Sequence, residues 1–120
     1  MDKQAKILDS EKTLHVLREI EQNPQVTQRN LAEKLEISLG QINFLLKALI
    51  DKGVIEAKNF KNSKNKFAYM YMLTPEGIKM KIELTQKFFI WKTEEYKKLQ
   101  QEIEILKKEA SYIFPEKERI

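Results

Sequence analysis

The stretch "VTQRNLAEKLEISLGQINFLLKALIDKG", residues 26–53, contains two apolar patterns of helical spacing, separated by only two or three residues around Ile37. In the first pattern, Thr27 stands where the capping residue of a short helix is expected. The apolar residues that would share one face of that helix are Leu31, Ala32 and Leu35. A short helix with one buried face is therefore predicted before Ile37.

The second pattern predicts a longer helix. Ser38 and Gln41 have the spacing of a capping box, and Lys52 with Gly53 supplies a stop. The core stripe of this helix would consist of Ile42, Leu45, Leu46, Leu49 and Ile50. Two helices joined by so short a turn predict a helix-turn-helix, whose second helix enters the major groove of DNA.

The flanking sequence extends the pattern on both sides. Upstream, "LDSEKTLHVLREIEQNP" predicts another helix, which begins after Asp9 or Ser10 and ends before Pro24. Downstream, two runs rich in β-branched and aromatic residues, 54–60 and 67–73, bracket the polar turn "KNSKNK" and predict a β-hairpin. Three helices followed by a hairpin is the element order of a winged helix-turn-helix, so the predicted fold is mainly α with a small β-hairpin (α+β).

The positive charge of the chain is concentrated in that hairpin. The chain has 22 bases and 18 acids, for a formal net charge of +4, and residues 57–73 contain four lysines and no acid. The segment therefore holds the entire excess, which favours contact with a polyanion such as the DNA backbone. A solvated loop that uses lysine for solubility is the alternative interpretation. The lysines are Lys58, Lys61, Lys64 and Lys66.

Residues outside the core stripe of the second helix are candidates for base contact. Gln41 and Asn43 can form paired hydrogen bonds to adenine, and Phe44 either contacts a thymine methyl group or is a peripheral core residue. Lys47 is a candidate for contact with a phosphate. The start of the preceding helix can also bind a phosphate, although Thr27 there could serve only as the helix cap. The full set predicted to contact DNA is Thr27, Gln28, Arg29, Ser38, Leu39, Gly40, Gln41, Asn43, Phe44, Lys47, Lys58, Lys61, Asn62, Ser63, Lys64, Asn65 and Lys66.

The last third of the chain predicts one long helix, which begins at Thr74 and Pro75 and meets no further proline before Pro115. At about 1.5 Å per residue its length is roughly 60 Å. Its apolar residues follow alternating steps of four and three, the spacing of a coiled-coil seam, which predicts self-association. A helix folded back on its own domain would instead need a break after about Trp91. The predicted dimer interface is Ile82, Thr85, Phe89, Tyr96, Leu99, Ile103, Leu106, Ala110 and Ile113.

The sequence also resembles a known family. Residues 26–57 followed by "LTPEGIKM" resemble the DNA-binding domain of MarR-type transcriptional regulators, in which a capped recognition helix ends in a Lys-Gly turn. "FKNSKNKFAYMYMLTPEGI", residues 60–78, resembles the small MarR-like regulators associated with bacterial exopolysaccharide gene clusters. The resemblance covers most of residues 10–110. It implies a sequence-specific regulator that binds double-stranded DNA as a homodimer and acts on exopolysaccharide genes.

Other function classes find little support. The single histidine, His15, has no cysteine or second histidine to form a metal site or a catalytic pair, so we expect neither an enzyme nor a cofactor. No apolar run is long enough to span a membrane, and the start of the chain has no signal-peptide pattern, so we expect a cytoplasmic protein. A protein-interaction scaffold is the alternative function, and an effector molecule stays an open question. The predicted organisation is a winged helix-turn-helix at 1–74, a dimerisation helix at 75–114 and a tail at 115–120.

Overall fold

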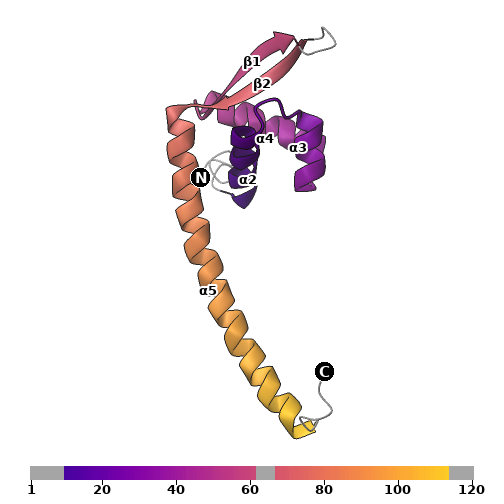
Figure 1. The fold of residues 1–120 in the computed structure, drawn as a ribbon, viewed down its shortest axis with the longest axis vertical. Coiled ribbons are helices and arrows are strands. Elements are labelled where there is room, and N and C mark those ends of the chain that lie inside the picture. Colours follow the sequence, from indigo (N-terminus) through magenta and orange to yellow (C-terminus); the bar gives the residue numbers. More distant parts are fainter. Residues whose placement is uncertain (1–9, 62–66, 114–120) are drawn as a thin grey trace. The chain divides into compact units, whose positions relative to one another are not determined.

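The computed structural model describes residues 10–61 and 67–113. It confirms a mainly helical chain with an antiparallel hairpin and a long C-terminal helix (Figure 1). The chain divides into two compact units, Met1–Thr85 and Gln86–Ile120, which are described separately below. The elements are α2 (Glu11–Gln22), α3 (Gln28–Leu35), α4 (Leu39–Asp51), β1 (Ile55–Lys61), β2 (Phe67–Leu73) and α5 (Pro75–Ile113).

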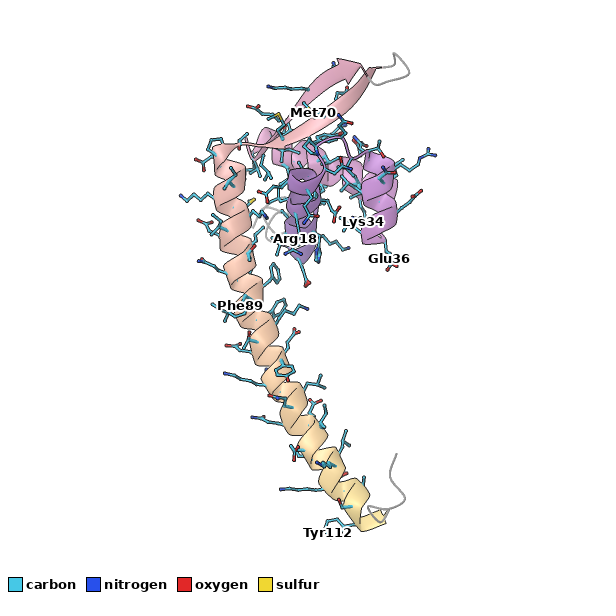
Figure 2. All side chains as sticks on the ribbon, in the orientation of Figure 1. Arg18, Lys34, Glu36, Met70, Phe89 and Tyr112 are labelled. Atoms are coloured by element: carbon cyan, nitrogen blue, oxygen red, sulfur yellow. The ribbon has the colours of Figure 1, made fainter. Side chains whose placement is uncertain are left out.

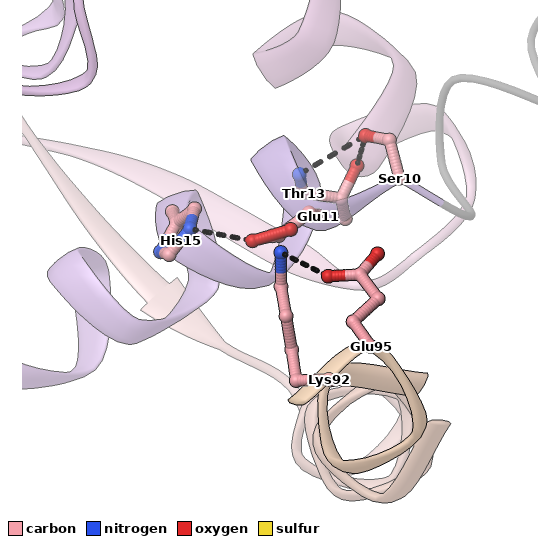
Figure 3. Close-up of polar contacts among 6 residues, drawn as sticks. All are labelled: Ser10, Glu11, Thr13, His15, Lys92 and Glu95. Carbon is pink, nitrogen blue, oxygen red and sulfur yellow. Dashed lines mark hydrogen bonds and ion pairs between the residues drawn. The ribbon is translucent and has the colours of Figure 1, made fainter. Parts of the chain in front are cut away.

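The helices of the first unit begin at the capping residues that the sequence indicates. Of the two candidates for α2, it is Ser10 whose side chain accepts a hydrogen bond from the backbone N–H of Thr13, at 3.2 Å (Figure 3). The Thr27 hydroxyl accepts from the N–H of Asn30 at 3.0 Å and caps α3. Each cap satisfies a backbone donor that the first turn of a helix leaves free, which fixes where the helix starts.

The turn between α3 and α4 contains a left-handed residue. Glu36, the residue after α3, has φ 56° and ψ 42°, and its N–H returns to carbonyl oxygens of the last turn. This conformation costs an L-residue about 1–2 kcal/mol, and it ends α3 so that the chain can turn into α4. An ion pair between Lys34 and Glu19, with N and O 2.9 Å apart, also links α3 to α2.

The core of the first unit lies among α2, α3 and α4, and it is built from the predicted stripes. Two predicted residues depart from this pattern: Leu35 is only half-buried, and Ile50 is 39% exposed, whereas Ala48 is buried. Successive helical residues are rotated by about 100°, so Ile50 turns away from the side that its neighbour Leu49 buries. The side chains that are less than 2% exposed are Thr13, Val16, Leu17, Ile20, Leu31, Ile42, Leu46, Leu49 and Ile55.

The hairpin pairs β1 with β2 in antiparallel register, from Ile55 opposite Leu73 to Lys61 opposite Phe67. Two hydrogen bonds of Tyr71 attach the hairpin to the turn before α3 and to α3 itself. Its backbone N–H donates to the carbonyl oxygen of Pro24 at 2.9 Å, and its buried hydroxyl accepts from the side-chain amide of Gln28 at 3.2 Å. The base of the hairpin, which is the wing of this fold, is therefore fixed beside the start of α3.

A close contact at the start of α5 closes the hairpin onto the loop after α4. The Thr74 hydroxyl accepts from the N–H of Gly77 at 3.1 Å, and the N–H of Thr74 donates to the carbonyl oxygen of Val54 at 3.0 Å. A Cβ atom added to Gly77 would lie 2.1 Å from that same carbonyl oxygen. Only glycine permits this approach of helix and loop.

The C-terminal unit is the continuation of α5, which runs without a break past Trp91 to Ile113. Its apolar side chains are mostly exposed, and Figure 2 shows Phe89 and Tyr112 standing out from the helix. An ion pair joins Lys92 to Glu95 along the helix, with N and O 3.6 Å apart (Figure 3). The predicted long helix is thus confirmed, and the break after Trp91 that the alternative of a folded-back helix would need is absent from this described segment.

Candidate nucleic-acid interface

The two faces of α4 differ sharply. One face carries Ile42, Leu45 and Leu46, each at most 3% exposed, which anchors the helix in the core. Phe44 lies on the opposite face and is 48% exposed, and Leu39, in the first turn at the flank of the buried stripe, is 47% exposed. Of the two interpretations of Phe44, the structure therefore favours a residue that faces solvent over a peripheral core residue. The other exposed candidates on α4 are Gly40, Gln41 and Lys47, whereas Asn43 is half-buried.

Ser38 and Gln41 are already partly engaged with each other. The Ser38 hydroxyl accepts from the N–H of Gln41 at 3.1 Å, and the Gln41 side-chain oxygen accepts from the N–H of Ser38 at 3.3 Å. This is the predicted capping box. It uses one of the two acceptor positions of the Gln41 oxygen, so a paired hydrogen bond to adenine would use the remaining acceptor position and the amide NH₂.

The three candidate residues at the start of α3 differ in their surroundings: two make hydrogen bonds within the protein, and the third is exposed. Thr27 is occupied as the N-cap, and half-buried Gln28 donates to the hydroxyl of Tyr71. Arg29 is exposed in the first turn. Of these residues, Arg29 is the one free to place a positive charge toward a phosphate, and contacts of Thr27 and Gln28 with DNA stay predictions.

Only part of the wing lies within the described residues. Lys58 is exposed on β1, and Lys61 is the last residue of that strand. The remaining predicted wing contacts lie outside the described residues, namely Asn62, Ser63, Lys64, Asn65 and Lys66. The register of β1 and β2 leads the chain directly into this lysine-rich segment and out of it.

Acidic residues are absent from all three segments that carry the candidate contacts. No Asp or Glu occurs between Glu21 and Glu33, between Glu36 and Asp51, or from residue 57 to residue 75. The first two gaps contain the starts of α3 and α4, and the third contains the wing. Of these three segments, a search for lysine clusters finds only the third, whereas a search for acid-free segments finds all three. A surface without carboxylates avoids repulsion of phosphates.

The predicted dimer residues lie along α5. Ile82 in the first unit is 54% exposed, and the large predicted side chains from Phe89 to Leu106 in the second unit are between 52% (Ile103) and 70% (Phe89) exposed. Thr85 is exposed, Ala110 is half-buried, and Ile113 is the last residue of the helix. The remaining members, all more than half exposed, are Tyr96, Leu99 and Leu106.

Residues 9–56 match the family model described as winged helix-turn-helix DNA-binding. The match covers the three helices of the first unit, and the hairpin follows it as the wing. The observed fold and the family match agree on the class of fold: the chain contains a winged helix-turn-helix, and the matching family is described as DNA-binding.

Solved structures of transcriptional regulators share this fold. A PadR-like transcriptional regulator from Bacillus cereus has a TM-score of 0.70 and 24% identity, over 79% of this chain and 97% of that one. A transcriptional regulator of the MarR family from Enterococcus faecalis has a TM-score of 0.62 and 21% identity, over 83% and 94%. A mutant of S. aureus MepR bound to an oligodeoxyribonucleotide has a TM-score of 0.55 and 22% identity, over 93% and 86%. At these identities the likeness shows the fold.

No curated protein sequence gives a significant match to the chain. Within residues 10–61 and 67–113, no group of three or more His, Cys, Asp or Glu residues could hold a metal ion. In the same part of the chain, none of the helices combines the length and apolar character needed to cross a bilayer. His15 lies 3.6 Å from a carboxylate oxygen of Glu11 on the surface of α2 (Figure 3).

Proposed function

We propose that the protein is a cytoplasmic transcriptional regulator of the MarR type that binds a specific double-stranded DNA sequence as a homodimer. The observation that carries the proposal is α4, which is anchored by one buried face and presents the opposite, acid-free face to solvent. A helix held in this way can enter the major groove without disturbing the core. Arg29 and the lysines of the wing supply the positive charge that phosphate contacts need.

The seam of α5 supports the homodimer. Leu99, Ile103 and Leu106 are 53%, 52% and 62% exposed in the single chain, although burying the rest of each side chain would gain roughly half of the 1.5–3 kcal/mol that complete burial supplies. A second copy of the same helix offers an identical stripe with the matching spacing. A twofold dimer has two DNA-binding domains. It would recognise an inverted repeat, with half-sites about one helical turn apart or a multiple of it.

The narrowest part of the proposal is control of exopolysaccharide genes, and it rests on the resemblance of residues 60–78. The alternative function is a protein-interaction scaffold, which the exposed apolar residues of α5 would also suit. The lysines at residues 57–73 favour DNA, because a protein-binding wing has no need to hold the entire positive excess.

Selection from a random duplex pool tests the proposal. The wild-type protein selects a sequence, the target duplex, and its affinity is then compared with that of a random duplex at several salt concentrations. We expect the target to bind at least about a thousandfold more tightly, and both affinities to fall steeply with salt. A protein that selects no sequence, or whose binding is insensitive to salt, would support the scaffold instead.

A further inference from the structure

Leu39 and Phe44 are large apolar side chains that the core of the first unit does not use. They are 47% and 48% exposed, while Ile42 between them is fully buried. The same helix therefore fills its core side completely and still carries two apolar groups on the outside. Packing within the described residues gives no reason for either group.

Gly40, next to Leu39, is equally unexplained by the fold. A Cβ atom added there would meet only the Ser38 hydroxyl oxygen, at 4.0 Å, and the backbone is not left-handed at this position. Alanine would fit and would favour the helix more than glycine does. Gly77 differs, because an added Cβ there would collide with a backbone oxygen. We therefore attribute the glycine at position 40 to a binding partner that approaches the backbone of α4 closely.

Charge and hydrogen bonding identify the kind of partner. Gly40, Phe44 and Lys47 follow steps of four and three and so lie on one face of α4, which combines an apolar group with a positive charge. The side-chain oxygen of Gln41 already accepts one hydrogen bond within the capping box. The partner of this face should thus be anionic, to pair with Lys47, and should offer an apolar group to Phe44. In the major groove of DNA the apolar group on a base edge is the C5-methyl group of thymine.

We propose that Leu39 and Phe44 recognise thymine methyl groups, and that Gly40 allows the backbone of α4 to approach the bases that carry them. The proposal rests on the proposed function and specifies the chemistry of its target. The half-site then contains at least two thymines at the positions where the start of α4 lies in the groove. Lys47, one turn further on, contacts a phosphate beside them.

Replacing thymine by uracil tests the proposal, because uracil forms the same base pair and lacks only the methyl group. The target duplex and a random duplex are each made with thymine and with uracil, and their affinities for wild-type protein are measured. We expect the target to lose about fourfold in affinity for each methyl group that is no longer buried. The random duplex should bind equally well in both forms. Equal affinity of the two target duplexes would overturn the proposal.

Protein variants locate the effect. The double variant Leu39→Ala and Phe44→Ala should bind the thymine and uracil targets equally, whereas the control Ile50→Ala, an exposed apolar residue of the same helix, should still distinguish them. Gly40→Ala should weaken binding to the target while the melting temperature stays the same or rises. A Gly40→Ala variant with wild-type affinity, or a double variant that still distinguishes the duplexes, would contradict the assignment.

Two further outcomes separate this proposal from the one on which it rests. A wild-type protein that selects no target refutes the proposed function itself. A protein that selects a target but binds its uracil form equally well refutes only the methyl contacts. If the double variant instead changes the sedimenting mass of the free protein, Leu39 and Phe44 belong to a protein interface, and the proposal is wrong.

Discussion

Two helices of this protein carry the same kind of apolar stripe, yet they differ in what covers it. In α4, Ile42, Leu46 and Leu49 are at most 1% exposed, because α3 and β1 of the same chain pack against the helix. In the C-terminal part of α5, Leu99 and Ile103 are more than half exposed. Helical spacing therefore predicts a helix, but it does not predict the partner. In α4 the partner is the same chain, and in α5 we propose a second copy.

The largest effect is expected from charging the α5 stripe. Leu99→Asp with Ile103→Asp would place carboxylates in the proposed seam, where like charges repel and lose hydration. We expect monomers whose winged helix-turn-helix is still folded, as measured by sedimentation equilibrium. Their affinity for the target duplex, measured by fluorescence anisotropy, should fall by at least about a hundredfold. The control Gln101→Asp adds a carboxylate on the other side of the helix and should leave the dimer intact. A charged-seam variant that still dimerises would show that another surface joins the subunits.

The wing lysines come next. Lys61→Ala, Lys64→Ala and Lys66→Ala together should weaken target and random DNA alike, by roughly a hundredfold at physiological salt. The slope of log affinity against log salt should fall by about one unit for each phosphate that the variant no longer neutralises. The control removes three lysines of the C-terminal unit that lie off the seam, Lys97, Lys98 and Lys108. If both triple variants change the slope equally, net charge rather than the wing governs binding.

A smaller effect is expected on the unfolding free energy of two glycine variants of the first unit. Gly77→Ala should lower the free energy of unfolding by about 1–3 kcal/mol, because the new Cβ would press against the carbonyl oxygen of Val54. Gly40→Ala, where there is room, should leave it unchanged or raise it by up to about 1 kcal/mol. Urea denaturation of both variants measures the difference. Equal destabilisation would mean that the approach of α5 to Val54 is looser than described.

The smallest effect tests how the wing is attached. Tyr71→Phe removes the hydroxyl that accepts from Gln28 and should cost about 0.5–1.5 kcal/mol in unfolding free energy. Tyr69→Phe, at a residue that is 58% exposed on the same strand, is the matched control and should cost almost nothing. If the two variants unfold alike, the hydrogen bond between strand and helix contributes nothing to stability.

Element boundaries in this protein could be predicted because they depend on neighbouring residues. Ser10, Thr27 and Ser38 each cap a helix within three residues, so the local sequence identifies the start. The hairpin strands were found for the same reason, since β-branched and aromatic runs flank a polar turn. The left-handed Glu36 was missed, because glycine is the usual signal at such a position.

Long-range contacts could not be predicted in this way. The bond from Gln28 to Tyr71 joins residues 43 positions apart, and nothing beside Gln28 in the sequence indicates that its side chain serves the wing. The contact of Gly77 with Val54 is hidden for the same reason. Among the candidate site residues, the sequence placed Phe44 near the edge of the α4 stripe but left its exposure open, because exposure depends on what the rest of the chain covers.

The most direct measurement is the composition of the complex with the target duplex, determined by sedimentation velocity with separate detection of protein and DNA. We predict two chains on each duplex, an inverted repeat with half-sites about one helical turn apart or a multiple of it, and a much weaker complex with random DNA. A single chain bound at full affinity, or equal binding to target and random duplexes, would contradict a dimeric, sequence-specific regulator.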